Sequence, residues 1–136
     1  MLRMRMTATA LALALVACSD ASGQEGGREA RLRMASQGLC DARAQASRSD
    51  VPRAAAVFNE EVHAFLHELA ADLQEIDRAA AAALLEAKQR VEAVIVDPAR
   101  SDPDEVAALL ADLERALDAA ARAAGLGGTV CREAGS

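Results

Sequence analysis

The sequence contains neither tryptophan nor tyrosine, and Phe58 and Phe65 are its only aromatic residues. Alanine fills many of the remaining apolar positions. A core rich in alanine buries little apolar area per residue, and burial stabilises a fold by only about 25 cal/mol per Å². A domain of this size is therefore marginally stable unless another device supports it.

Glycine is also scarce, because Gly38 is the only glycine between Glu29 and Ala124. The sequence accordingly lacks a glycine-rich phosphate-binding loop and the glycine-flanked serine of a nucleophile elbow. Acidic residues are abundant, but no pattern indicates that one of them is buried as a general acid or base. We therefore expect that the protein is not an enzyme.

Basic residues are outnumbered, with 15 Lys and Arg against 21 Asp and Glu and a formal net charge of −6. An acidic protein is repelled by phosphate backbones and by anionic lipid headgroups. The charge thus argues against nucleic acid as a partner and permits cationic partners or metal ions.

The N-terminus has the organisation of a secretory signal. Arg3 and Arg5 precede an apolar run over residues 7–17. This run is about half of the roughly 20 residues that a membrane-spanning helix needs. It ends in Leu15-Val16-Ala17-Cys18, which resembles the lipobox of bacterial lipoproteins. The resemblance covers residues 1–20 and implies cleavage before Cys18, whose thiol then carries a diacylglycerol with fatty acyl chains such as palmitate.

The resemblance divides the chain into three parts. Residues 1–17 are the predicted signal peptide, and residues 18–28 form a lipid-anchored tether whose small and polar residues predict flexibility. Residues 29–136 form the predicted domain. The implied location is the extracytoplasmic side of a bacterial membrane, which is the periplasm in a Gram-negative host, with the membrane itself as one partner.

Three cysteines are an odd number for a secreted protein. If Cys18 is acylated, Cys40 and Cys131 remain as a pair in an oxidising compartment, and we expect a disulfide between them. The alternative is two free, buried thiols. The disulfide would close a loop of about 90 residues and contribute roughly 4–5 kcal/mol, which an alanine-rich core needs.

Apolar periodicity predicts helices over residues 29–47, 52–96 and 103–124. In the first, Ser36 and Gly38 dilute the apolar face. The last has the clearest start, with Asp102 as N-cap and Pro103 as the first helical residue. Glycines follow its end. The second carries one stripe with steps of three or four residues, formed by Phe58, Val62, Phe65, Leu69, Leu73, Ile76, Ala80, Ala83, Ala87, Val91 and Val94.

The predicted fold is all-α, an antiparallel three-helix bundle with a long central helix. The alternative is a four-helix bundle with a break near residues 77–78. No glycine or proline marks such a break, so the three-helix arrangement is the primary prediction.

The two histidines of the chain, His63 and His67, are four residues apart, which places both imidazoles on one face of a helix. A zinc, copper or nickel ion needs three or four ligands, and Glu60 or Asp41 is the candidate third. The alternatives are histidines that face water or a partner, and a pH-sensitive role. The predicted function is a lipid-anchored helical module that binds or scaffolds an envelope protein, with transition-metal binding through His63, His67 and Glu60 as the alternative.

Overall fold

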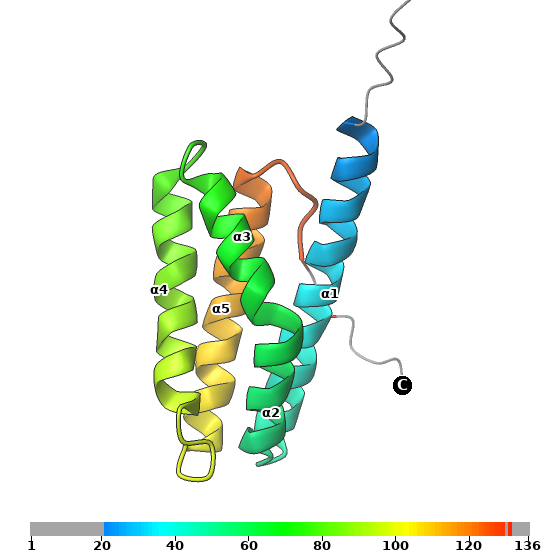
Figure 1. The fold of residues 1–136 in the computed structure, drawn as a ribbon. Coiled ribbons are helices and arrows are strands. Elements are labelled where there is room, and N and C mark those ends of the chain that lie inside the picture. Colours follow the sequence, from blue (N-terminus) through cyan, green and yellow to red (C-terminus); the bar gives the residue numbers. More distant parts are fainter. Residues whose placement is uncertain (1–20, 130, 132–136) are drawn as a thin grey trace, which may run out of the picture.

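A computed structural model describes residues 21–129 and residue 131, and the regular structure within these residues is entirely helical. The predicted all-α class is confirmed. The elements are α1 (Ala21–Ser47), α2 (Val51–Val57), η1 (Phe58–Val62), α3 (His63–Leu73), α4 (Arg78–Ile95) and α5 (Pro103–Ala123). Because α2, η1 and α3 follow one another without a gap, they form a single bent helix, and the described chain has four helical rods (Figure 1).

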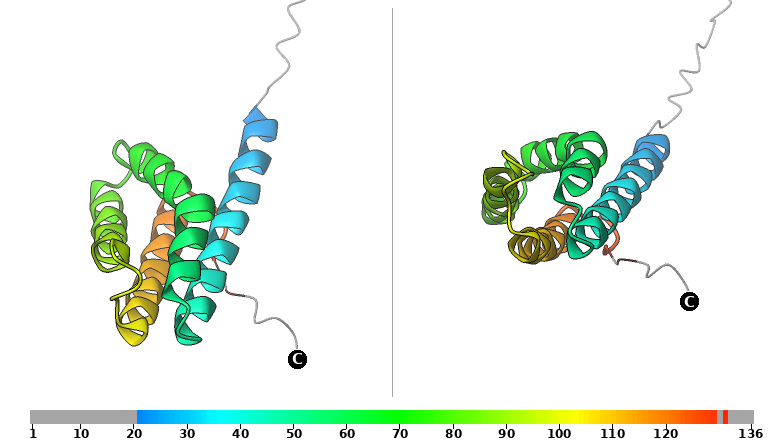
Figure 2. Two further views of the ribbon diagram at one scale, coloured as in Figure 1. Left: turned by 60° about the horizontal axis from the view of Figure 1, so that its bottom comes forward. Right: turned by 90° about the horizontal axis from the view of Figure 1, so that it is seen from below.

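The rods alternate in direction and close into a ring, which Figure 2 shows from below. Along this ring, α1 packs against α2 and α5, whereas α4 packs against α3 and α5. Short connections between consecutive helices favour antiparallel packing of these helices. The core is the space enclosed by the ring, and its bulk comes from leucines such as Leu39, Leu66, Leu84 and Leu113.

The predicted long helix over residues 52–96 is wrong, because α3 ends at Leu73 and α4 begins at Arg78. Asp77 causes the break: its backbone is extended (φ −151°, ψ 90°), and its side chain accepts a hydrogen bond from the N–H of Ala80 at 3.0 Å. The aspartate N-cap therefore starts a new helix at a position where the sequence contains no glycine or proline to mark the break. The four-helix alternative with a break near residues 77–78 is compatible with this arrangement.

The predicted apolar stripe fails at the same place. It is correct from Phe58 to Leu73, but Ile76 is 62% exposed and Ala83 lies on the surface. The turn shifts the helical phase, so that the buried residues of α4 are Ala81, Leu84, Lys88, Val91 and Ile95. These residues are also three or four positions apart, but the charged Lys88 in the middle of the series makes the buried face hard to recognise from sequence. Of the predicted stripe in α4, Val91 is buried, and Ala80, Ala87 and Val94 are partly buried against the core.

The segment η1 is a short π-helix in which the N–H of His63 donates to the carbonyl of Phe58, five residues back. It lies against α1 at Gly38. A Cβ atom on Gly38 would lie 2.9 Å from Cγ2 of Val62 and 3.1 Å from Cβ of Glu61. The glycine that dilutes the apolar face of α1 is thus the position where α1 approaches the bent helix closely enough to exclude a side chain.

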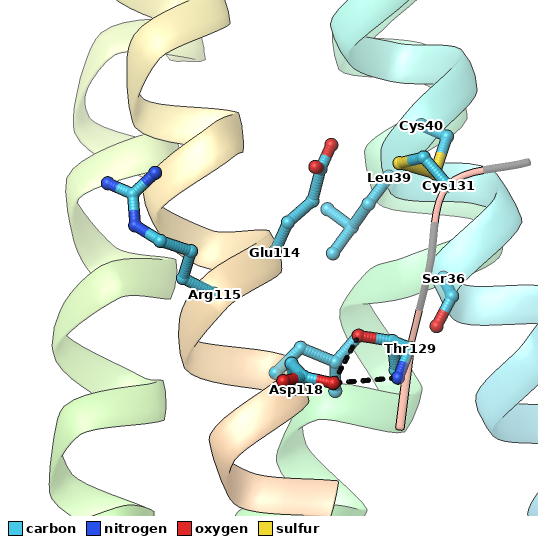
Figure 3. A pocket seen from close by; sticks show the side chains of 9 residues that line it. Ser36, Leu39, Cys40, Glu114, Arg115, Asp118, Thr129 and Cys131 are labelled. Carbon is cyan, nitrogen blue, oxygen red and sulfur yellow. Dashed lines mark hydrogen bonds between the residues drawn. A yellow bond between two sulfur atoms is a disulfide. The ribbon is translucent and has the colours of Figure 1, made fainter. Parts of the chain in front are cut away.

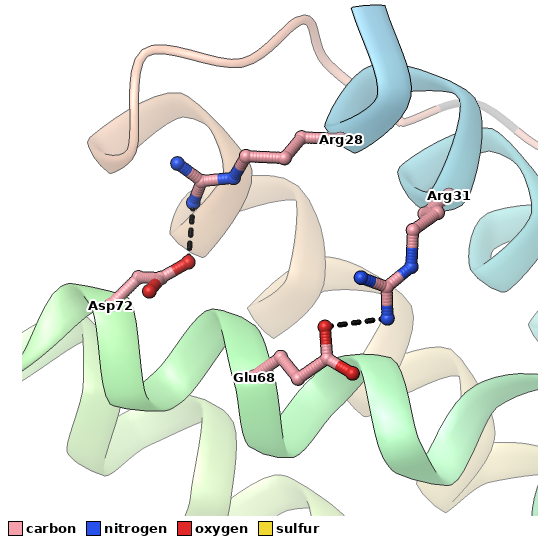
Figure 4. A network of polar contacts seen from close by, with 4 residues as sticks. All are labelled: Arg28, Arg31, Glu68 and Asp72. Atoms are coloured by element: carbon pink, nitrogen blue, oxygen red, sulfur yellow. Dashed lines mark hydrogen bonds and ion pairs between the residues drawn. The ribbon is translucent and has the colours of Figure 1, made fainter. Parts of the chain in front are cut away.

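The predicted buried face of α1 is confirmed and consists of Leu32, Ala35, Leu39, Ala42 and Ala46. In the structure α1 begins at Ala21, earlier than the predicted start near Glu29, so residues 21–28 of the proposed tether are helical. Two ion pairs join this end of α1 to α3: Arg28 with Asp72 at 2.6 Å and Arg31 with Glu68 at 2.5 Å (Figure 4).

The predicted start of the last helix is confirmed, because Asp102 caps α5 and Pro103 is its first residue. Within the described part of the chain, no helix has both the length and the apolar composition needed to cross a bilayer.

Candidate functional site

Cys40 on α1 and Cys131 are joined by a disulfide, the pairing that the sequence predicts, with Cα atoms 5.5 Å apart and a sequence separation of 91. The chain reaches α1 because Gly125 adopts φ +74° and ends α5. The following residues, 125–129, together with Cys131 form what we call the C-terminal segment. Asp118 fixes its course, because Oδ1 accepts a hydrogen bond from the N–H of Thr129 at 2.8 Å.

The C-terminal segment borders a pocket of about 450 Å³ between α1 and α5 (Figure 3). This volume is within the range of small-ligand sites, roughly 300–1,000 Å³. The lining comes from three parts of the chain: Ser36, Leu39 and Cys40 on α1, Glu114, Arg115, Leu117 and Asp118 on α5, and Thr129 and Cys131 in the C-terminal segment.

Two buried polar atoms in this lining have no hydrogen-bond partner among the described residues, Oγ of Ser36 and Oε1 of Glu114. Nε of Arg43 lies 3.0 Å from Oε1 of Glu114 and balances its charge without a well-directed hydrogen bond. Burial raises the pKa of Glu114, although the charges of Arg43 and Arg115 oppose the rise. A buried polar atom without a hydrogen bond lowers stability by about 1–3 kcal/mol. A bound group that forms hydrogen bonds with these two atoms would recover part of this free energy.

The histidine pair lies together as predicted. The ring centroids of His63 and His67 are 4.8 Å apart, with an angle of 75° between the ring planes. The proposed third ligand does not join them: among the described residues, neither Glu60 nor Asp41 belongs to a group of three ligand atoms within 4.8 Å of one another.

His63 contacts the carboxylate of Glu92, which the sequence does not predict. Its Nε2 lies 2.9 Å from Oε1 of Glu92 on α4, and Nζ of Lys88 lies 2.6 Å from the same oxygen. Burial raises the pKa of Glu92, but the hydrogen bond and charge of Lys88, with a contribution from His63, lower it below its ordinary value. Lys88 is only 3% exposed. Its ammonium group contacts the same carboxylate oxygen as His63 and opposes a metal cation there.

One group of potential metal ligands within 4.8 Å of one another does occur in the described part of the chain, formed by Cys40, Glu114 and Cys131. In the structure its two sulfur atoms are bonded to each other. The sequence contains no local signal for this group, because its members come from α1, α5 and the C-terminal segment.

The predicted signal peptide and Cys18 lie outside the described residues, so lipidation of Cys18 stays a prediction. Comparison with known proteins gives no match to a family model, a curated protein or a solved structure.

Proposed function

We propose that the protein is a non-enzymatic, lipid-anchored component of a bacterial envelope and that its helical domain binds another envelope protein. The signal sequence and the lipobox-like residues before Cys18 support the location. A disulfide between Cys40 and Cys131 is in keeping with an oxidising compartment.

The observation that carries the binding function is the pocket between α1 and α5 with two buried polar atoms that make no hydrogen bond to the described residues. Oε1 of Glu114 accepts a hydrogen bond from a partner, and the hydroxyl of Ser36 can donate one. Leu39 and Leu117 add apolar surface to the same lining. An amide group, from a peptide bond or from an Asn or Gln side chain, has both the N–H donor and the carbonyl acceptor that these atoms need. We therefore propose that the partner inserts an amide-bearing segment into this pocket.

Site-specific photo-crosslinking in the living bacterium tests this proposal. A photoreactive residue replaces Arg115, which is exposed and lines the pocket, and a matched variant carries it at Ala82, which is exposed on α4 and does not line it. We expect a crosslinked protein from position 115 that weakens when Glu114→Gln or Ser36→Ala is added, and none from position 82. Equal crosslinking at both positions, or an adduct indifferent to both substitutions, would contradict the proposal.

Metal binding by the histidine pair is the second candidate. The adjacent rings favour it. Glu92 contacts His63, but among the described residues it does not form with both histidines a group of three ligand atoms within 4.8 Å of one another. Titration of the oxidised protein with zinc, copper and nickel tests it. If the pair binds metal, His63→Ala with His67→Ala abolishes binding and Lys88→Met strengthens it, because the competing ammonium is gone. Binding indifferent to these substitutions removes the candidate.

A further inference from the structure

We propose that reduction of the Cys40–Cys131 disulfide creates a zinc site whose ligands are the two cysteine thiolates and the carboxylate of Glu114. The observation is that one ligand atom from each of these residues lies within 4.8 Å of the other two. The three residues come from α1, α5 and the C-terminal segment, so the ion would join parts of the chain that are distant in sequence. This inference goes beyond the proposed binding of a partner and does not depend on it.

The geometry suits zinc. Zn–S bonds of about 2.3 Å and Zn–O bonds of about 2.0–2.2 Å at tetrahedral angles place two sulfurs roughly 3.7 Å apart and a sulfur and an oxygen roughly 3.5 Å apart. A carboxylate oxygen of Glu114 lies within 4.8 Å of both sulfurs, so it needs to approach them by at most about 1.3 Å. The sulfurs must move apart from a bonded distance of about 2.05 Å, and rotation of the two side chains achieves this.

The chemistry balances with a dithiol as reductant. The dithiol transfers two electrons to the Cys40–Cys131 bond and itself becomes a disulfide, and the two sulfurs of the protein each gain a proton. Zinc then replaces these two protons, which are released, because the thiolate is the metal ligand. The disulfide and the zinc site exclude each other, since they use the same sulfur atoms. An oxidant that forms the disulfide therefore releases the ion.

Glu114 is the better-placed carboxylate for the ligand role. Both oxygens of its neighbour Asp118 are engaged, because Oδ1 accepts the N–H of Thr129 and Oδ2 pairs with Arg122 at 2.8 Å. Oε1 of Glu114 is 3.0 Å from Nε of Arg43 but makes no well-directed hydrogen bond. The bond between Asp118 and Thr129 does not involve the sulfurs, so it holds the C-terminal segment against α5, which packs on α1, after reduction. Cys131 therefore stays within reach of Cys40.

The charges around the site also suit a divalent cation. Two thiolates and a carboxylate carry three negative charges against the two positive charges of zinc. Arg43, whose Nε is 3.0 Å from Oε1 of Glu114, offsets the remaining one. Three protein ligands leave the fourth position of zinc open, and the adjoining pocket of about 450 Å³ has room for a water molecule there.

The test uses the full chain, purified in detergent, reduced with a dithiol and desalted under anaerobic conditions before zinc is added. We expect one zinc ion per reduced chain by elemental analysis, and no zinc at this site in the oxidised chain. With cobalt in place of zinc, the reduced chain should show thiolate-to-metal charge transfer and the visible bands of a tetrahedral site. Reduced wild-type chain that takes up no zinc would overturn the proposal.

Zinc binding by four variants distinguishes the proposed site from other possible zinc sites in the chain. Glu114→Gln should weaken zinc binding at least about tenfold, because it removes a direct ligand. Glu105→Gln, an exposed position on the same helix, should bind as the wild type does. Cys40→Ser with Cys131→Ser retains Cys18 and should bind no zinc at this site, whereas His63→Ala with His67→Ala should fill this site fully. Circular dichroism checks that each variant is helical. Unchanged affinity in Glu114→Gln would overturn the assignment of this ligand and with it the proposed site.

Discussion

Replacement of both bridging cysteines, Cys40→Ser with Cys131→Ser, should lower the free energy of unfolding by about 4.6 kcal/mol. The bridged residues are 91 apart in sequence, and the chain-entropy relation for a loop of this length gives about 4.6 kcal/mol at 25 °C. With an unfolding entropy of about 2.1 cal/mol/K per residue, a domain of about 110 residues loses roughly 20 °C in melting temperature. This is a large fraction of the 5–15 kcal/mol typical of a domain.

Urea unfolding followed by circular dichroism measures this difference, with a chelator present so that metal cannot replace the disulfide. The wild-type chain should lose about the same free energy when it is reduced, and the double serine variant should not respond to the reductant. A difference below about 1 kcal/mol would refute the reasoning, because it would mean that the bridge does not restrict the unfolded chain.

Three further predictions concern single residues. Gly38→Ala should lower stability by about 1 kcal/mol, because a Cβ 2.9 Å from Cγ2 of Val62 outweighs the gain in helix propensity; a urea midpoint at or above that of the wild type would contradict this. Ser49 has φ 63°, so Ser49→Gly should raise stability by about 0.5–1 kcal/mol in thermal unfolding, whereas Ser49→Ala should not. Burial raises the pKa of Glu114 above its ordinary 4.5, so the folded chain binds the extra proton and loses stability as pH rises through the raised pKa. Glu114→Gln should therefore be more stable than the wild type at pH 7 and lack this loss of stability above pH 4.5; parallel stability profiles would argue against it.

The parts of the fold that sequence predicts well depend on local signals. Asp102 and Pro103 are adjacent in sequence and define the start of α5 without help from the rest of the chain. The buried face of α1 also follows from spacing alone. The disulfide pairing followed from counting, since only two cysteines remain once Cys18 is assigned to the lipid.

The parts that sequence does not predict depend on tertiary contacts. The burial of Lys88 is explained by its ion pair with Glu92, whose carboxylate also contacts His63. Without this tertiary contact, a lysine is not expected on the buried face of α4. The turn before Asp77 carries only a capping signal that also occurs in many loops. Gly38 is explained by its contact with Val62, which is remote in sequence.

The candidate site could be predicted only in fragments. The spacing of His63 and His67 correctly placed their rings side by side. Glu92 is on another helix, and its approach to His63 requires the break between α3 and α4. The pocket and the position of Glu114 beside Cys40 and Cys131 require the path of the C-terminal segment, which no periodic pattern encodes.

The proposed location and partner both depend on the lipid at Cys18, which mass spectrometry of the chain purified from bacterial membranes tests most directly. We expect that the mature chain begins at Cys18 and that its first peptide carries a diacylglycerol on the cysteine sulfur and fatty acyl chains. Cys18→Ser should lack this modification and leave the membrane fraction. A chain that begins elsewhere, or an unmodified Cys18, would contradict the account.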